Sequence, residues 1–215
     1  MTKTTKMTKL NKNMPAKRRP GHLGGSAFGG DFKKDLLLVD LETTGLDAQK
    51  HEIIQIAAIL LDRKTLKEKE AFSSYIKPAK WKKRDLESMK INGITWENLK
   101  SAPSLKEVLA QFSKLFKPSD VVLSYYGGPL DMDFLRAAYA EVGMKWRFDY
   151  HFFNLWGMFY AFLASRGQLK NPSRHAGFSL EDLMSKFKIR SKNRHDALED
   201  CRIEAEILRK IIKSL

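Results

Sequence analysis

The feature that most constrains this chain is an apolar run that ends in two carboxylates. Residues 36–39 are all Leu or Val, and they lead directly into Asp40-Leu41-Glu42-Thr43-Thr44-Gly45. A short apolar run that stops at a turn signal predicts a buried strand. Side chains two apart on a strand share a face, so Asp40 and Glu42 should lie side by side.

Two adjacent carboxylates repel each other unless one is protonated or a cation lies between them. Hard oxygen ligands of this kind favour Mg²⁺ or Mn²⁺. The alternative is a pair of solvated acids at the end of a strand, and these two residues alone do not decide between the readings.

The rest of the pattern predicts the α/β class, with a mixed sheet flanked by helices. Strands are expected over residues 52–61 and 71–76, and their short connections favour an antiparallel meander with the first strand. A helix is expected over 85–91, and Ser104 should cap another that carries one wide apolar stripe. A fourth strand over 120–125 and later helices follow, which adds alternating α and β elements. The aromatic-dense stretch 146–163 is expected to lie mostly in the core.

Charge and length suggest one domain with a polyanionic partner. The 215 residues carry a formal net charge of +14 and a sequence pI near 9.8, which favours nucleic acid as the partner. The first 30 residues hold seven Lys or Arg and no acid. We expect residues 1–31 to form a disordered basic tail and residues 32–215 the globular domain. The tail is either a solubilising or leader segment or a weak, salt-sensitive grip on phosphates.

A single cysteine, Cys201, excludes an internal disulfide and fits a reducing cytosol, so a cytoplasmic protein is expected. The sequence contains no apolar run of membrane-spanning length and no secretory signal at its N-terminus.

Further acids stand at predicted element boundaries. Asp131 opens a helix directly after a strand and a Gly-Gly-Pro break, and its neighbour Asp133 should point about 200° away from it. Asp200 precedes Cys201 on the buried edge of the last helix, so it needs a partner or a metal ion. His195 converges with Asp200 only if it lies in the loop before that helix. Read alone, Asp131 is an ordinary first-turn acid and His195 an ordinary surface histidine.

Three motifs in order give the chain a family resemblance. Asp40 to Gly45 matches D-x-E-T-T-G, Asp131 to Leu135 matches D-x-x-F-L, and His195, Ala197 and Asp200 match H-x-A-x-x-D. The chain, over roughly residues 33–215, resembles the DnaQ-like (DEDDh) 3′→5′ exonucleases, the group of polymerase III epsilon-type proofreading domains and RNase T. That family implies an RNase H-like fold.

The resemblance also implies the roles of individual residues. Asp40, Glu42, Asp131 and Asp200 would be metal-binding carboxylates for two divalent ions, Mg²⁺ or Mn²⁺, and His195 would be the general base. The substrate contacts that it implies are Thr43, Thr44, Glu87, Ile91 and Asn92. Asn154 stands where relatives commonly carry an Asp, and Ser124 to Leu130 differ from the family's loop.

The function predicted from these motifs is metal-dependent 3′→5′ hydrolysis of single-stranded nucleic acid, with DNA favoured and nucleoside monophosphates released. Two alternatives stay open: an RNA or oligoribonucleotide exonuclease, and a non-catalytic nucleic-acid-binding domain on the same fold. A polymerase or repair complex is a further candidate partner, although the segments that bind a polymerase in some relatives are not expected beyond the last helix.

Overall fold

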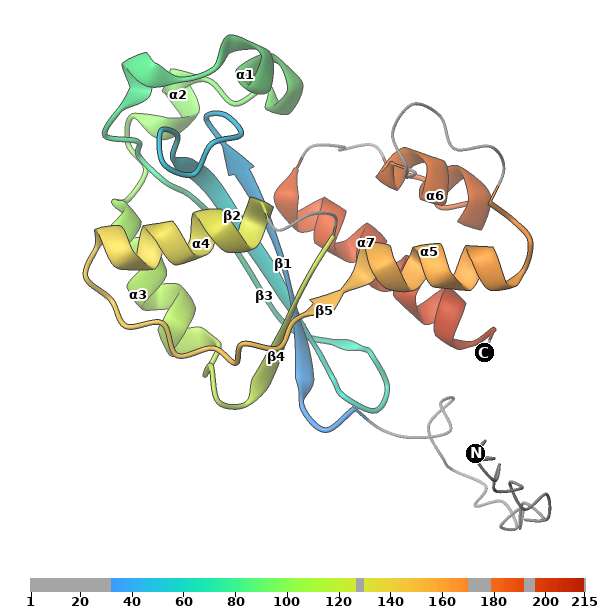
Figure 1. Cartoon of the computed structure of the whole chain (residues 1–215). Coiled ribbons are helices and arrows are strands. Elements are labelled where there is room, and N and C mark those ends of the chain that lie inside the picture. Colours follow the sequence, from blue (N-terminus) through green and yellow to red (C-terminus); the bar gives the residue numbers. More distant parts are fainter. Residues whose placement is uncertain (1–31, 127–129, 170–178, 192–195, 215) are drawn as a thin grey trace, which may run out of the picture.

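A computed structural model describes residues 32–126, 130–169, 179–191 and 196–214 (Figure 1). The tail predicted for residues 1–31 lies outside these ranges. None of the helices within them is long and apolar enough to cross a bilayer. The elements, in chain order, are β1 (Asp35–Thr43), β2 (Ile53–Leu61), β3 (Glu68–Tyr75), η1 (Trp81–Lys83), α1 (Leu86–Asn92), α2 (Trp96–Leu99), α3 (Leu105–Leu115), β4 (Val121–Tyr125), α4 (Leu130–Glu141), β5 (Phe153–Asn154), α5 (Leu155–Ser165), α6 (Leu180–Phe187) and α7 (Ala197–Ile212).

The strands form one mixed sheet in the order β3-β2-β1-β4-β5. The pairs β1–β2 and β2–β3 are antiparallel, as the short connections between them require. The pairs β1–β4 and β4–β5 are parallel, and helices lie in the connections that lead to β4 and β5. The predicted α/β class with a meander and parallel strands is confirmed. β3 extends over 68–75 rather than 71–76, because its charged first residues still pair with β2.

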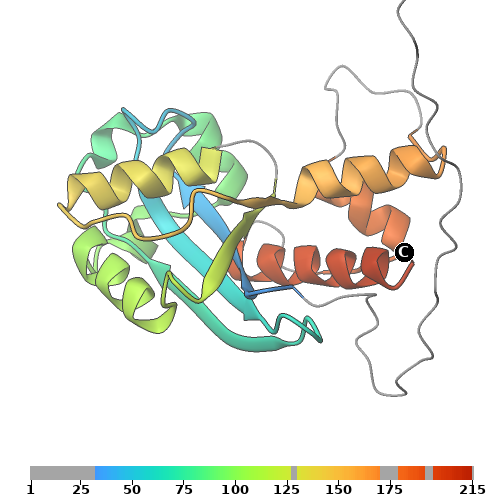
Figure 2. The same ribbon diagram turned by 60° about the horizontal axis from the view of Figure 1, so that its bottom comes forward.

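β1 is buried on both faces, and its alternating side chains enter two separate cores. Leu36 and Leu38 pack with α5, α6 and α7, whereas Leu37, Val39 and Leu41 pack with α3 and α4. Figure 2 shows the two groups of helices on either side of the sheet. Asp40 and Glu42 continue the even-numbered face, so the strand directs both carboxylates toward the side covered by α7.

The aromatic-dense stretch is mostly core, as predicted. Phe148 is buried against α3 and α4, while Phe159 and Phe162 are buried on the other face. Tyr150 is the clear exception, with 76% of its surface exposed. The sequence pattern did not predict the two-residue strand β5 within this stretch. Asn154 ends it and caps α5, where its Oδ1 accepts a hydrogen bond from the Gly157 N–H at 2.9 Å.

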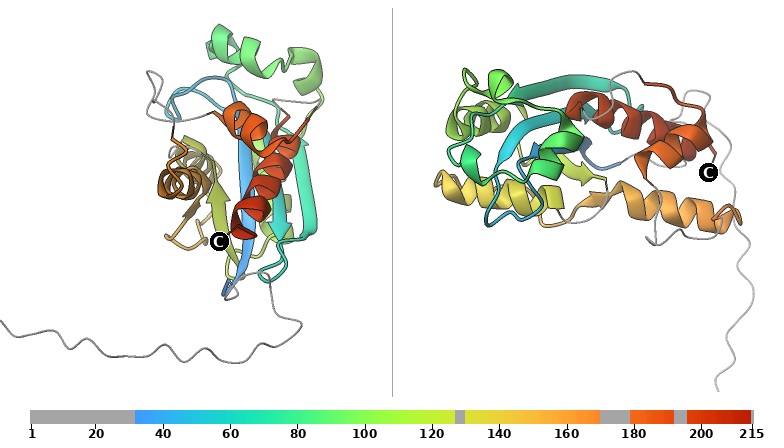
Figure 3. Two further views of the ribbon diagram at one scale, coloured as in Figure 1. Left: turned by 90° about the vertical axis from the view of Figure 1, so that its right-hand side faces the viewer. Right: turned by 90° about the horizontal axis from the view of Figure 1, so that it is seen from above.

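Beyond the end of the sheet, η1, α1 and α2 form a small lobe (Figure 3, left). α1 agrees with the predicted helix and stops at Gly93, whose φ of +66° is a left-handed conformation that glycine adopts without strain. Neither η1 nor α2 was predicted, because three or four residues are too few to show a helical period. The lobe is tied to the end of β1: the Asn92 side-chain amide donates to the Thr43 carbonyl at 3.2 Å.

Candidate active site

The first two acids of the site lie next to each other near the C-terminal end of β1. Asp40 is paired in register with Ala57 and Glu42 with Gln55, so both residues are held by the antiparallel partner β2. Both are half-buried. The register shifts directly after Glu42, where β1 leaves its regular pairing.

The turn after β1 is fixed by its own polar groups. The Thr43 hydroxyl donates to the Gly45 carbonyl at 2.7 Å, and the Thr44 hydroxyl accepts from the Glu52 N–H at 3.0 Å. A Cβ on Gly45 would lie 2.5 Å from the His51 ring, so this position needs a glycine. Both threonine hydroxyls therefore stabilise the turn that follows the two acids.

The third acid comes from the first turn of α4. Asp131 is half-buried, whereas Asp133 is exposed. Met132, Phe134 and Leu135 are buried, so the apolar face of α4 sets the rotation of the helix. This rotation places Asp131, rather than Asp133, in the same acidic cluster as Asp40.

The remaining acids come from α7, which packs across β1 and β2. The Cys201 thiol lies 3.8 Å from the Leu38 carbonyl oxygen and 3.9 Å from that of Ala57, the residue paired with Asp40. This contact fixes the first turns of α7 beside Asp40. Asp200 and Glu204 on those turns are 7% and 1% exposed. α7 begins at Ala197, after His195, which itself lies outside the described residues.

The carboxylates act on one another electrostatically. Burial raises the pKa of Asp40 well above its ordinary value, and the negative charges of four other acids raise it further: Asp131, Glu204, Glu42 and Asp200. Burial raises the pKa of Asp131 from 3.8 to about 7. Five acids from three separate elements therefore share one strongly negative region, which we call the acidic cluster.

Glu204 was not among the residues singled out from the sequence. The signal was present, since Glu204 stands four residues after Asp200 and directly before Ala205 on the buried seam of α7. The argument that turned Asp200 inward, its place next to a buried Cys201, applies equally to Glu204. The family motif ends at Asp200, which drew attention away from the following turn.

The donor chemistry of the acidic cluster fits a hard divalent cation. In the described part of the chain no three His, Cys, Asp or Glu side chains already lie close enough together to hold an ion. The five acids nevertheless supply only carboxylate oxygens, the ligands that Mg²⁺ and Mn²⁺ prefer. A cation would also offset the mutual repulsion that raises the pKa of Asp40.

The predicted substrate contacts in the lobe lie around α1. Ile91 is 63% exposed, an unusual setting for a large apolar side chain, and Glu87 is exposed as well. Asn92 is half-buried, and its Oδ1 accepts from the Ile94 N–H at 3.0 Å while its amide group binds the end of β1. α1 therefore presents an apolar and an acidic side chain to solvent and is attached to the same turn as Thr43.

Residues 37–208 match the family model described as "Exonuclease" (RNase_T). The chain belongs to this exonuclease family. The DNA polymerase III subunit epsilon of Treponema pallidum is 30% identical over 173 residues, which are 80% of this chain and 74% of that protein. The DNA polymerase III PolC-type of Thermotoga maritima is 27% identical over 180 residues, 83% of this chain but only 12% of the longer protein.

The exonuclease chain also shares its fold with a solved structure of the family. The nuclease domain of 3′hExo, a DEDDh family member bound to rAMP, superimposes with a TM-score of 0.68. The two are 19% identical, and the match covers 86% of this chain and 95% of that domain. The predicted family and the RNase H-like fold are confirmed, and the family is divalent-metal dependent.

We expect the metal-free exonuclease chain to lose thermal stability as pH rises from about 4 to about 7. The pKa of Asp131 is about 7 in the folded protein and near 3.8 when unfolded, so the folded state binds more protons within this window. Stability then falls with rising pH. Thermal unfolding in EDTA at several pH values measures the effect, with about 2–4 °C for each kcal/mol in a chain of this size.

The Glu204→Gln variant provides the control for this stability prediction. It removes one of the charges that raise the pKa of Asp40, so its melting temperature should fall less steeply with pH than that of the wild type. A metal-free protein whose stability rises across the same window in both forms would contradict the electrostatic description of the cluster.

Proposed function

We propose that this chain is a 3′→5′ exonuclease that hydrolyses single-stranded nucleic acid, with DNA favoured, and releases nucleoside monophosphates. The observation that carries the proposal is the acidic cluster. Acids from β1, α4 and α7, far apart in the sequence, raise the pKa of Asp40 together. These are the same acids that the three family motifs name, with Glu204 in addition.

In this proposal Asp40, Glu42, Asp131 and Asp200 hold two divalent ions, Mg²⁺ or Mn²⁺. When bound, such ions lower the pKa of an attacking water and stabilise charge on the departing 3′-oxygen. His195 accepts the proton of that water, which a neutral imidazole can do near cellular pH. The turn of Thr43 and Thr44, with Ile91 and Asn92 of α1, orients the terminal nucleotide over the cluster.

DNA is the favoured substrate because the relatives described above are DNA polymerase III proteins. An RNA or oligoribonucleotide substrate is the alternative, and the rAMP bound to the 3′hExo domain supports keeping it. A non-catalytic binding domain is disfavoured, since grouping five carboxylates costs electrostatic energy that phosphate binding alone would not require.

We expect purified protein to release labelled mononucleotides from 3′-labelled single strands in Mg²⁺ or Mn²⁺ and none in EDTA. DNA and RNA strands of equal sequence and several lengths, assayed in parallel, decide the sugar preference. A 5′-labelled strand serves as the control for direction, because it should shorten one nucleotide at a time without early release of its label. Metal-independent release, or release first from the 5′ end, would contradict the proposal.

A further inference from the structure

A strongly basic loop joins β3 to α1. Residues 77–84 read Lys-Pro-Ala-Lys-Trp-Lys-Lys-Arg, which is five cations in eight residues with no acid. We call this segment the basic loop. Lys77, Lys80, Lys82 and Lys83 are exposed, and Arg84 is half-buried. The family motifs do not include this segment, and the acidic cluster does not account for it.

Part of this charge has no counter-ion within the protein. Lys80 lies 3.9 Å from a Glu141 carboxylate oxygen, a weak, solvent-exposed pair. Among the described residues, neither Lys82 nor Lys83 has an ion-pair partner, and Lys77 has none either. Three exposed ammonium groups are therefore available to an external anion.

Two tryptophans stand beside these cations. The Trp81 and Trp96 ring centroids are 5.6 Å apart, with 38° between the ring planes. Trp81 packs on the small core of Ile54, Ile94 and Leu99, and the Arg84 guanidinium lies 4.6 Å from its centroid. Trp96, at the start of α2, is 38% exposed. The inner ring anchors the lobe, and the outer ring offers a surface to solvent.

The basic loop is held rigidly at the end of the sheet that carries the acidic cluster. The Glu52 carboxylate accepts hydrogen bonds from the Ala79 N–H at 2.9 Å and the Lys80 N–H at 2.7 Å. Asp85, the residue after the loop, donates its N–H to the Thr44 carbonyl at 2.7 Å. Thr44 stands two residues after Glu42. Figures 1 and 3 show the lobe beyond this end of β1.

We propose that the basic loop and Trp96 bind the single-stranded part of the substrate that lies upstream of the terminal nucleotides. Phosphates contact Lys82 and Lys83, and a base stacks on Trp96. Cations that follow the backbone next to an exposed aromatic ring are the usual means of binding single strands without sequence preference. This inference rests on the proposed function, because it assumes that the strand reaches the lobe from the acidic cluster.

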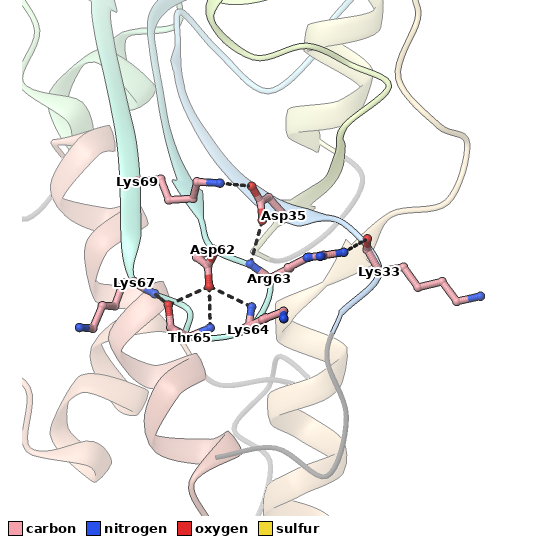
Figure 4. Close-up of polar contacts among 8 residues, drawn as sticks. All are labelled: Lys33, Asp35, Asp62, Arg63, Lys64, Thr65, Lys67 and Lys69. Carbon is pink, nitrogen blue, oxygen red and sulfur yellow. Dashed lines mark hydrogen bonds and ion pairs between the residues drawn. The ribbon is translucent and has the colours of Figure 1, made fainter. Parts of the chain in front are cut away.

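The experiment compares Lys82→Gln/Lys83→Gln and Trp96→Ala with a charge-matched control. The control is Lys33→Gln/Lys67→Gln, around the β2–β3 hairpin at the opposite end of the sheet, where both ammonium groups extend into solvent (Figure 4). Binding of a fluorescent oligo(dT) 12-mer is measured in EDTA at several salt concentrations. Hydrolysis of 3′-labelled 12-mers and trimers is measured in Mg²⁺.

The proposal expects each lobe variant to bind the 12-mer about tenfold more weakly, a typical loss for one stacked base or two phosphate contacts. For Lys82→Gln/Lys83→Gln the slope of log K against log salt should fall by about 1.4, or about 0.7 for each phosphate. KM for the 12-mer should rise, whereas kcat and the trimer should be unaffected. The control variant should match the wild type.

Three outcomes would overturn the inference: lobe variants that behave like the control, equal losses on trimer and 12-mer, or polyglutamate that competes as well as oligo(dT). Failure of the proposed function looks different, because wild-type protein would then release no mononucleotide from any strand. Length-independent hydrolysis by an active wild-type enzyme, unaffected by the lobe variants, would leave the nuclease assignment intact and refute only the role of the lobe.

Discussion

Replacing Asp40 with Asn should reduce metal-dependent nucleotide release by about 10³-fold or more while the protein stays folded. Asp40 is the centre of the acidic cluster, since four other acids act on its pKa. Loss of its charge removes a metal-binding oxygen and weakens the positioning of the ions, which supply several kcal/mol of transition-state stabilisation. Each 1.36 kcal/mol is a factor of ten in rate. Single-turnover release from a 3′-labelled strand at saturating metal measures the effect.

The same substitution should make the metal-free protein more stable at pH 8. An amide in place of the carboxylate removes repulsion with Asp131, Glu204, Glu42 and Asp200, so we expect a higher melting temperature in EDTA. The added stabilisation that wild type gains from Mg²⁺ or Mn²⁺ should then be lost. Opposite effects on activity and stability distinguish removal of a functional charge from damage to the fold.

The control for Asp40→Asn is Asp35→Asn, the same change at the other end of β1. Asp35 lies 2.7 Å from the Lys69 ammonium group in an exposed ion pair, far along the strand from the cluster. Its loss should cost little stability and no activity. Near-wild-type release by Asp40→Asn, or an equal loss in both variants, would contradict the assignment of Asp40.

The sequence predicted the sheet well because β1 carries an unambiguous pattern. An uninterrupted apolar run is buried on both faces, and the alternation that places Leu36 and Leu38 in one core carries on into Asp40 and Glu42. The same periodicity correctly turned Asp200 inward on α7. Where a residue's direction follows from its immediate neighbours, sequence reasoning reached the site.

The lobe could not be predicted in the same way. η1 and α2 are too short to show a period, and Trp81 and Trp96 meet only because the chain folds back onto Ile54 of β2. Glu204 was overlooked for a different reason, since the family motif ends one turn earlier. The part of the site that depends on tertiary contacts between short segments therefore required coordinates.

Replacing His195 with Gln should lower the catalytic rate by about 10²- to 10⁴-fold, the usual range for loss of a general base. The neutral Gln side chain cannot accept the water proton near pH 7, but it leaves the carboxylates and the lobe unchanged. Binding of oligo(dT) in EDTA should therefore stay near the wild-type value. Rate and affinity measured on the same preparation separate a chemical role from a role in binding.

The pH dependence decides whether His195 acts as the base. At saturating metal the wild-type rate should fall below about pH 6.5 as an unperturbed imidazole becomes protonated, and His195→Gln should lack that limb. Saturating metal is required because protonation of Asp131, whose pKa is about 7 without metal, would otherwise weaken the cluster in the same pH range. The exposed His151, paired with Asp149 at 2.8 Å, provides the matched control in His151→Gln. An acid limb that persists in His195→Gln would move the base role to another group.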